Sequence, residues 1–184
     1  RSSDLGARVH VGGNIGTPLL DRLDQIQPGD PIVLELSSFQ LELFDAQLAW
    51  GDMATVGPDV AAILNITPNH LDRHPDMAAY ANAKFNLWRY LPANAQLVLS
   101  ADDAVTQRVA TASGIDGGAD GFQPLPAAWQ LDEPLANLRA AITRQAGAIV
   151  PFSRLRSLSH GAWLDGETLI YEGQPICHRR EVLL

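Results

Sequence analysis

Three side chains of this 184-residue chain occupy positions where a polar group is costly or unusual. The first is Glu35, which interrupts the apolar run of residues 32–36. Such a run predicts a strand buried on both faces, where a carboxylate is unfavourable unless it is paired or metal-bound. Glu35 lies toward the carboxyl end of this predicted strand, where open α/β sheets bind ligands. It is therefore a candidate ligand, with a water-exposed glutamate on an edge strand as the alternative.

The second candidate is His70, in a loop that follows the apolar run of residues 61–66. The loop also contains Asp72 and His74, so it gathers two imidazoles and a carboxylate within a few residues. A polar turn in which Asp72 caps the next helix is the alternative interpretation. The position after a strand favours His70 as a ligand or catalyst. We expect His74 to be exposed to solvent.

The third candidate is Lys84, which interrupts the apolar stripe of a predicted helix. Met77, Tyr80, Trp88 and Leu91 recur at helical spacing, and Lys84 falls four residues after Tyr80 and four before Trp88. Burial on such a stripe would favour the neutral, reactive amine. Alternatively, the stem is buried and the ammonium group reaches water. The sequence leaves both interpretations open.

A neutral lysine can react with carbon dioxide to give a carbamate, which is an oxygen ligand for a hard metal ion. A carbamate, a carboxylate and an imidazole together would suit Mg²⁺. This hypothesis unites Lys84, Glu35 and His70 in one metal site.

Two further segments carry weaker signals. Gly12-Gly13-Asn14-Ile15-Gly16 matches neither a dinucleotide-binding fingerprint nor a Walker motif, although its glycines permit close approach to a ligand and Asn14 offers a donor and an acceptor. As a lone motif, this segment is better read as a plain turn. Ser37 stands between a predicted strand and a helix, where a hydroxyl caps the helix or binds an anion, and capping is the default.

The elements that would position these residues alternate between strands and helices. Apolar runs predict strands at residues 32–36, 61–66 and 97–99, and the best helix runs between Pro75 and Pro92. This alternation predicts an α/β fold with a doubly wound, mostly parallel sheet.

The remaining predicted elements are local. Residues 17–23 predict a short helix followed by a turn at Pro28-Gly29-Asp30, and residues 112–126 a loop. Residues 134–146 predict an amphipathic helix with Leu135, Leu138 and Ile142 on one face. Residues 162–171 predict a hairpin about Asp165-Gly166, within a small β-rich region spanning residues 148–184.

Composition narrows the class of protein. A net charge of −8 argues against general affinity for nucleic acid or anionic membranes. No apolar run approaches the roughly 20 residues of a membrane span. The single cysteine, Cys177, excludes an internal disulfide and suits a cytoplasmic protein. The start at Arg1 lacks a methionine and a signal peptide, so we expect an excised piece of a longer protein.

Taken together, these segments resemble the Mur ligase family, and within it the D-glutamate-adding members. The likeness runs from about residue 9 to residue 103. It is carried by residues 11–16, 34–42, 64–74 and 80–84 and by Ser100-Ala101-Asp102-Asp103. The loop containing His70 and the following Lys84 are shared across the family. The Gly-Gly-Asn-Ile-Gly and Glu-Leu-Ser-Ser-Phe-Gln segments point to the D-glutamate-adding members.

The resemblance implies an ATP-dependent ligase of peptidoglycan precursor synthesis that joins D-glutamate to UDP-N-acetylmuramoyl-L-alanine through an acyl phosphate, with two Mg²⁺ ions. It implies that Glu35 and His70 bind metal, that Lys84 is the carbamylated ligand, and that Asn14, Ser37 and His70 contact the muramoyl substrate. Residues 1–184 would be the central ATPase domain, related to P-loop NTPases. The complete protein would be a monomer.

The departures from the family are equally informative. The Walker-type loop expected shortly before Gly12 is absent, as are the N-terminal UDP-binding domain and the C-terminal domain. We therefore expect the isolated chain to be inactive. A sheet that lacks a central strand exposes unpaired edges, so the fragment is expected to self-associate. The alternatives are a non-catalytic nucleotide- or metal-binding module and a related amide ligase such as a folylpolyglutamate synthetase.

Overall fold

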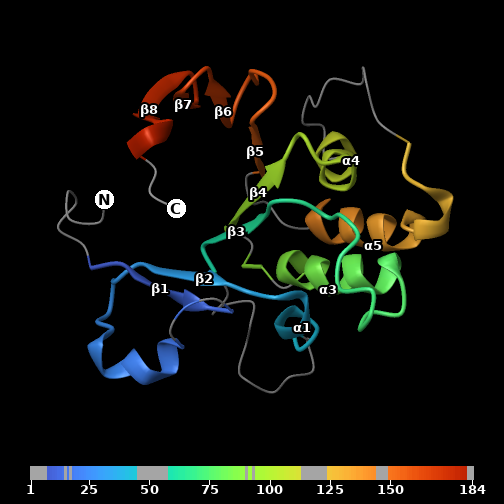
Figure 1. Ribbon diagram of the computed structural model, residues 1–184, viewed down its shortest axis with the longest axis horizontal. Helices are drawn as coiled ribbons and strands as arrows, with labels where there is room; N and C mark the ends of the chain where they lie inside the picture. The colour runs from blue at the N-terminus through green and yellow to red at the C-terminus, as the bar shows by residue number, and fades with distance from the viewer. Residues whose placement is uncertain are drawn as a thin grey trace. The chain divides into compact units, whose positions relative to one another are not determined.

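The computed structural model describes residues 8–14, 16, 18–44, 58–89, 91–92, 94–112, 124–143 and 149–181. The chain divides into two compact units, Arg1–Leu43 and Phe44–Leu184, and each unit is described by itself. Figure 1 shows the elements of both units. The predicted single domain over residues 1–184 stays a prediction.

The first unit contains a two-stranded parallel sheet. Strand β1 (His10–Gly13) pairs with β2 (Ile32–Glu35), with Gly13 opposite Glu35. The 3₁₀ helix η2 (Leu19–Gln25) and a turn at residues 28–29 connect the two strands, and α1 (Ser38–Leu41) follows β2. The predicted strand, short helix and turn of this segment are confirmed, with the helix two residues later than expected.

The second unit is built on a six-stranded sheet of order β3-β4-β5-β6-β7-β8. Strands β3 (Val60–Ile63), β4 (Gln96–Ser100), β5 (Ile149–Ser153) and β6 (Ala162–Asp165) are mutually parallel. Helix α3 (Met77–Arg89) connects β3 to β4. Helices α4 (Ala104–Ala112) and α5 (Asp132–Thr143) lie between β4 and β5 in the chain, with the short 3₁₀ helix η3 (Ala127–Trp129) before α5. The predicted α/β fold with a mostly parallel sheet is confirmed.

Three helices and the adjoining strands enclose the core of this unit. Figure 1 shows α3 and α5 side by side, and α5 also contacts α4. The predicted stripe of α3 is buried, and Trp88 stacks on Phe85 with ring centroids 5.9 Å apart. Leu135 and Leu138 of α5 join the same cluster, whereas the side chain of Ile142 lies outside the described set. Most of the loop predicted at residues 112–126 also falls outside the described residues.

The C-terminal part of the sheet is antiparallel. Strands β6 and β7 (Thr168–Tyr171) form the predicted hairpin about Gly166, and β8 (Gln174–His178) pairs with β7. The 3₁₀ helix η4 (Arg179–Glu181) follows. Strand β8 was not anticipated, although Glu172 and Gly173 both have the positive φ angles that a tight hairpin turn requires.

The sequence overstated the burial of two strands. All four residues of β2 are exposed, and β3 alternates between exposed and buried positions. An apolar run is compatible with burial on both faces, but burial also needs elements that cover the strand. Among the described residues β2 pairs only with β1, and the exposed positions of β3 face away from the helical core. None of the described helices is long and apolar enough to cross a membrane.

Candidate functional site

The Gly-Gly-Asn segment is held against the carboxyl end of β2. The backbone N–H of Asn14 donates to the carbonyl oxygen of Glu35 over 2.7 Å. Gly13 has φ +117°, and a Cβ atom built on it would lie 2.1 Å from the same carbonyl oxygen. Only glycine fits there without distortion. The close approach that Gly13 permits therefore serves the neighbouring strand, while the side chains of Asn14 and Glu35 stay exposed.

Ser37 forms the cap that was its default interpretation. Its Oγ accepts a hydrogen bond from the backbone N–H of Gln40 over 3.3 Å, and Gln40 Oε1 accepts from the backbone N–H of Ser37 over 2.8 Å. The pair is a capping box at the start of α1. Ser37 is partly buried, and its role toward a substrate stays a prediction.

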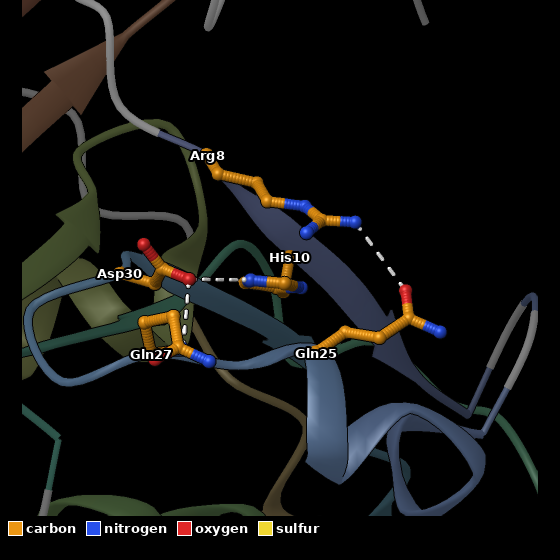
Figure 2. A network of polar contacts seen from close by, with 5 residues as sticks. All are labelled: Arg8, His10, Gln25, Gln27 and Asp30. Carbon is orange, nitrogen blue, oxygen red and sulfur yellow. Dashed lines mark hydrogen bonds and ion pairs between the residues drawn. The ribbon is translucent and has the colours of Figure 1, made fainter.

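A polar network fixes the opposite end of the two-stranded sheet, as Figure 2 shows. His10 Nε2 lies 2.9 Å from Asp30 Oδ2, which also accepts from the backbone N–H of Gln27 over 2.9 Å. The Gln27 bond and then the His10 contact hold the pKa of Asp30 below its ordinary value. Arg8 donates to Gln25 in the same region, over 3.4 Å. This network joins the start of β1 to the turn before β2.

His70 stands in a constrained loop after β3. Its φ of 55° is in the left-handed region, which residues other than glycine rarely adopt. The side chain of Asn69 accepts from the His70 N–H over 2.9 Å, and the His70 carbonyl accepts from the N–H groups of Arg73 and His74. This tight turn leaves the His70 side chain exposed. Backbone strain at a candidate ligand is typical of functional sites.

One expectation about this loop is wrong, and one alternative interpretation is not borne out. His74 is 1% exposed rather than solvent-facing, because the turn brings its ring against Tyr80 in an edge-on contact with centroids 5.3 Å apart. Asp72 does not cap the next helix: Asp76 does, by accepting from the N–H of Ala79 over 2.8 Å.

Lys84 combines features of both interpretations left open by the sequence. Its side chain is half-buried, and its Nζ lies 5.0 Å from the centroid of the Tyr80 ring. The ammonium donates to the carbonyl oxygen of Asn65 over 3.2 Å. Lys84 is therefore held at the end of β3, close to the start of the loop that carries His70.

The structure brings Lys84 to the segment that leads to His70, both in the second unit. Glu35, Asn14 and Ser37 belong to the first unit. Within the described ranges, no group of three or more His, Cys, Asp or Glu side chains gathers at one point. The metal-ligand set of Glu35, His70 and Lys84 therefore remains a prediction.

Sequence reasoning treated Asp103 only as part of a turn, yet it links three segments of the second unit. Its Oδ2 accepts from the backbone N–H of Ile66 over 3.1 Å, and its Oδ1 caps α4. The signal available in the sequence was an aspartate directly before a helix. The contact with a residue 37 positions earlier had no signal.

Comparison with known proteins defines the class to which this fold and these segments belong. Residues 12–116 match the model of the Mur ligase middle domain, and the chain belongs to that family.

Among individual proteins, the chain is 31% identical over 179 residues to a UDP-N-acetylmuramoylalanine–D-glutamate ligase of Clostridium botulinum (strain 657 / Type Ba4). That alignment covers 97% of this chain and 30% of the relative. Proteins of the same name from Clostridium perfringens (strain 13 / Type A) and Acetivibrio thermocellus are 42% and 43% identical over 107 and 105 residues. These cover 58% and 57% of this chain and 21% and 20% of the relatives. The chain thus spans less than a third of their length.

Proposed function

We propose that this chain is part of an ATP-dependent ligase that joins D-glutamate to UDP-N-acetylmuramoyl-L-alanine during synthesis of peptidoglycan precursors in the cytoplasm. The observation that carries the proposal is the 31% identity, over 97% of the chain, to a relative named for that ligation. Lys84 anchored at the end of β3, and His70 strained in the loop that follows, support a built site in the second unit.

The proposed reaction forms an amide in two steps. The terminal carboxylate of the substrate's L-alanine attacks the γ-phosphorus of ATP, and ADP leaves, which gives an acyl phosphate. The amine of D-glutamate then attacks the acyl carbon, inorganic phosphate leaves, and the amine loses a proton. Positioning and charge stabilisation dominate catalysis of such phosphoryl transfers.

The chain's own residues would contribute oxygen, nitrogen and amide groups to this site. Glu35 and His70, with Lys84 as its carbamate, make a donor set that suits Mg²⁺ in hardness and charge. When bound, Mg²⁺ would offset negative charge on the transferring phosphoryl group. Asn14 and Ser37 would help to hold the muramoyl substrate. Asn14 directly follows the last residue of β1, and Ser37 lies two residues after the end of β2.

The experiment measures phosphate release by the complete ligase that contains this segment, with ATP, UDP-N-acetylmuramoyl-L-alanine and D-glutamate. Glu35→Gln, His70→Ala and Lys84→Arg should each abolish most of the D-glutamate-dependent release. Glu133→Gln, which alters an exposed carboxylate in the first turn of α5, is the matched control and should stay active. Wild-type activity in all three site variants would refute the proposal.

Two further measurements separate the alternatives. A folylpolyglutamate synthetase-like enzyme would accept a folate and L-glutamate in place of the muramoyl substrate and D-glutamate. The 184-residue chain alone should release no phosphate, because its only lysine is Lys84, which follows alanine rather than the glycine of a Walker motif. ATP- and D-glutamate-dependent release by this chain would overturn that expectation.

A further inference from the structure

The peptide group between Asn65 and Ile66 has a charged partner on each side. Its N–H donates to Asp103 Oδ2 over 3.1 Å, and its carbonyl oxygen accepts from Lys84 Nζ over 3.2 Å. The N–H and C=O of a trans peptide point in opposite directions within one plane. The carboxylate and the ammonium therefore lie on opposite sides of a single peptide, which they orient between them.

Asp103 is a rigid partner for this peptide. Its second oxygen, Oδ1, accepts from the N–H groups of Val105 and Thr106 over 3.1 and 2.9 Å, which caps α4. Thr106 is fully buried, and its hydroxyl donates to the carbonyl of Ser100 over 2.7 Å. Each oxygen of Asp103 thus has a separate task, one at α4 and one at the segment after β3.

Lys84 is confined from a second direction. The ring of Tyr80, 3% exposed, lies under the amine at 5.0 Å, and the Asn65 carbonyl sets the direction in which the amine points. Ile66, next in the chain, is 1% exposed and packs in the core, so this segment has little freedom to follow a displaced lysine. The orientation of the Asn65–Ile66 peptide therefore determines where the amine of Lys84 lies.

We propose that Asp103 is a positioning residue for Lys84 and acts through the Asn65–Ile66 peptide. With Lys84 unmodified, both hydrogen bonds are charge-assisted, and such bonds are about twice as strong as neutral ones. They also polarise the peptide in the same sense, so each strengthens the other. Loss of the carboxylate would free the peptide to rotate and release the amine from the Tyr80 ring. That this matters for catalysis rests on the proposed function of Lys84, whereas the positioning itself does not.

The test compares Asp103→Asn with Asp102→Asn in the 184-residue chain. Asparagine is an equally good helix cap, so Oδ1 keeps its bonds to α4, but its NH₂ group cannot accept from Ile66. Asp102 is the matched neighbour: it accepts from Ser153 Oγ over 2.6 Å and from the Arg154 N–H over 2.7 Å, and neither contact involves the Asn65–Ile66 peptide.

The readout is the signal of lysine labelled with ¹³C at Cε. Lys84 is the only lysine, so one resonance reports on it without assignment. In the wild type the Hε protons should carry an upfield ring-current shift from Tyr80. Asp103→Asn should lose most of that shift, whereas Asp102→Asn should retain it. Retention of the full shift in Asp103→Asn, or equal loss in both variants, would overturn the proposal.

A reciprocal variant keeps the test decisive if Asp103→Asn does not fold. Lys84→Met removes the cation from a half-buried position and leaves Asp103 intact. The amide of Ile66 should then exchange with solvent faster than in the wild type, while the capped amide of Val105 exchanges at its wild-type rate. Unchanged exchange at Ile66 would refute the coupling. These spectra do not depend on ligase activity. An active Lys84→Arg ligase would refute the proposed function, and it would leave the positioning of Lys84 by Asp103 to be decided by the spectra alone.

Discussion

Substitution of Gly13 by alanine should damage the two-stranded sheet of the first unit far more than a comparable change elsewhere in that unit. A Cβ at this position would stand 2.1 Å from the Glu35 carbonyl oxygen, in a backbone with φ +117°. Gly29 provides the matched control, because it also has a positive φ, +93°, but a Cβ there meets nothing within 4 Å. The pair separates steric overlap from backbone strain.

The magnitudes follow from these geometries. Left-handed backbone costs an alanine about 1–2 kcal/mol, which both variants share. Relief of the overlap in Gly13→Ala adds about 1–3 kcal/mol, as in overpacked sites. Separating the strands also weakens the bond from the Asn14 N–H to the Glu35 carbonyl, which contributes about 0.5–1.5 kcal/mol. The excess over the control is therefore about 1.5–4.5 kcal/mol, and about 1.4 kcal/mol corresponds to a tenfold change in an equilibrium constant.

Amide hydrogen exchange, read by mass spectrometry on peptides that contain β1 and β2, measures this difference locally. Gly13→Ala should reduce protection more than tenfold beyond the reduction in Gly29→Ala, down to the rates of an unfolded peptide. Peptides from α3 and β4 should be unchanged in both variants. Equal protection of β1 and β2 in the two variants would refute the argument that the Glu35 carbonyl excludes a side chain at Gly13.

Three further predictions concern pH, strain and packing. The depressed pKa of Asp30 means that its contribution to the first unit is complete above the unfolded-state pKa and is lost as the pH falls through the lower folded-state pKa. Protection of β1 should therefore fall on acidification, and this dependence should be weaker in Asp30→Asn but not in the control Asp24→Asn. His70→Gly should raise the free energy of unfolding of the second unit in urea by about 0.5–1 kcal/mol, because glycine relieves the strain of the positive φ at this position. The same change should abolish activity of the complete ligase. A lower free energy of unfolding in this variant would contradict the presence of backbone strain at His70. Trp88→Ala should lower the free energy of unfolding of the second unit by about 3–5 kcal/mol. The control Leu155→Ala alters a side chain that is 78% exposed and should lower it by less than about 0.5 kcal/mol. Similar values for the two variants would contradict the burial of Trp88 in the core.

Local signals account for the elements that were predicted correctly. Helix α3 was recognisable because proline precedes and follows it and because its apolar residues recur at helical spacing. The β6–β7 hairpin was recognisable because glycine supplies a positive φ at Gly166. Both features depend on residues adjacent in the chain or one helical turn apart.

The details that were missed depend on distant contacts. His74 looked exposed because it precedes proline in a polar loop, but its ring is covered by Tyr80 from the following helix. The contact of Asp103 with Ile66 was missed because Ile66 lies 37 positions earlier in the chain, after another strand. The burial of β2 was overstated because composition records how apolar a segment is and not which elements cover it.

The candidate site likewise combines features that the sequence reveals with contacts that it does not. The residue types and order of Glu35, His70 and Lys84 were sufficient to suggest a metal site and to reveal the family likeness. The anchoring of Lys84 between an aromatic ring and a carbonyl oxygen could not be inferred, because it requires the relative placement of α3 and the segment after β3.

The two borders of the six-stranded sheet differ in their capacity to accept another strand. β8 contains Pro175, which has no N–H to offer, and its pairing with β7 is irregular, so this border is poorly suited to extension. β3 borders the other side with four residues that include neither proline nor a charge. Among the described residues, intermolecular strand addition to the six-stranded sheet should therefore begin at β3 rather than β8, and a lysine in place of the exposed Val60 is the substitution that would discourage it.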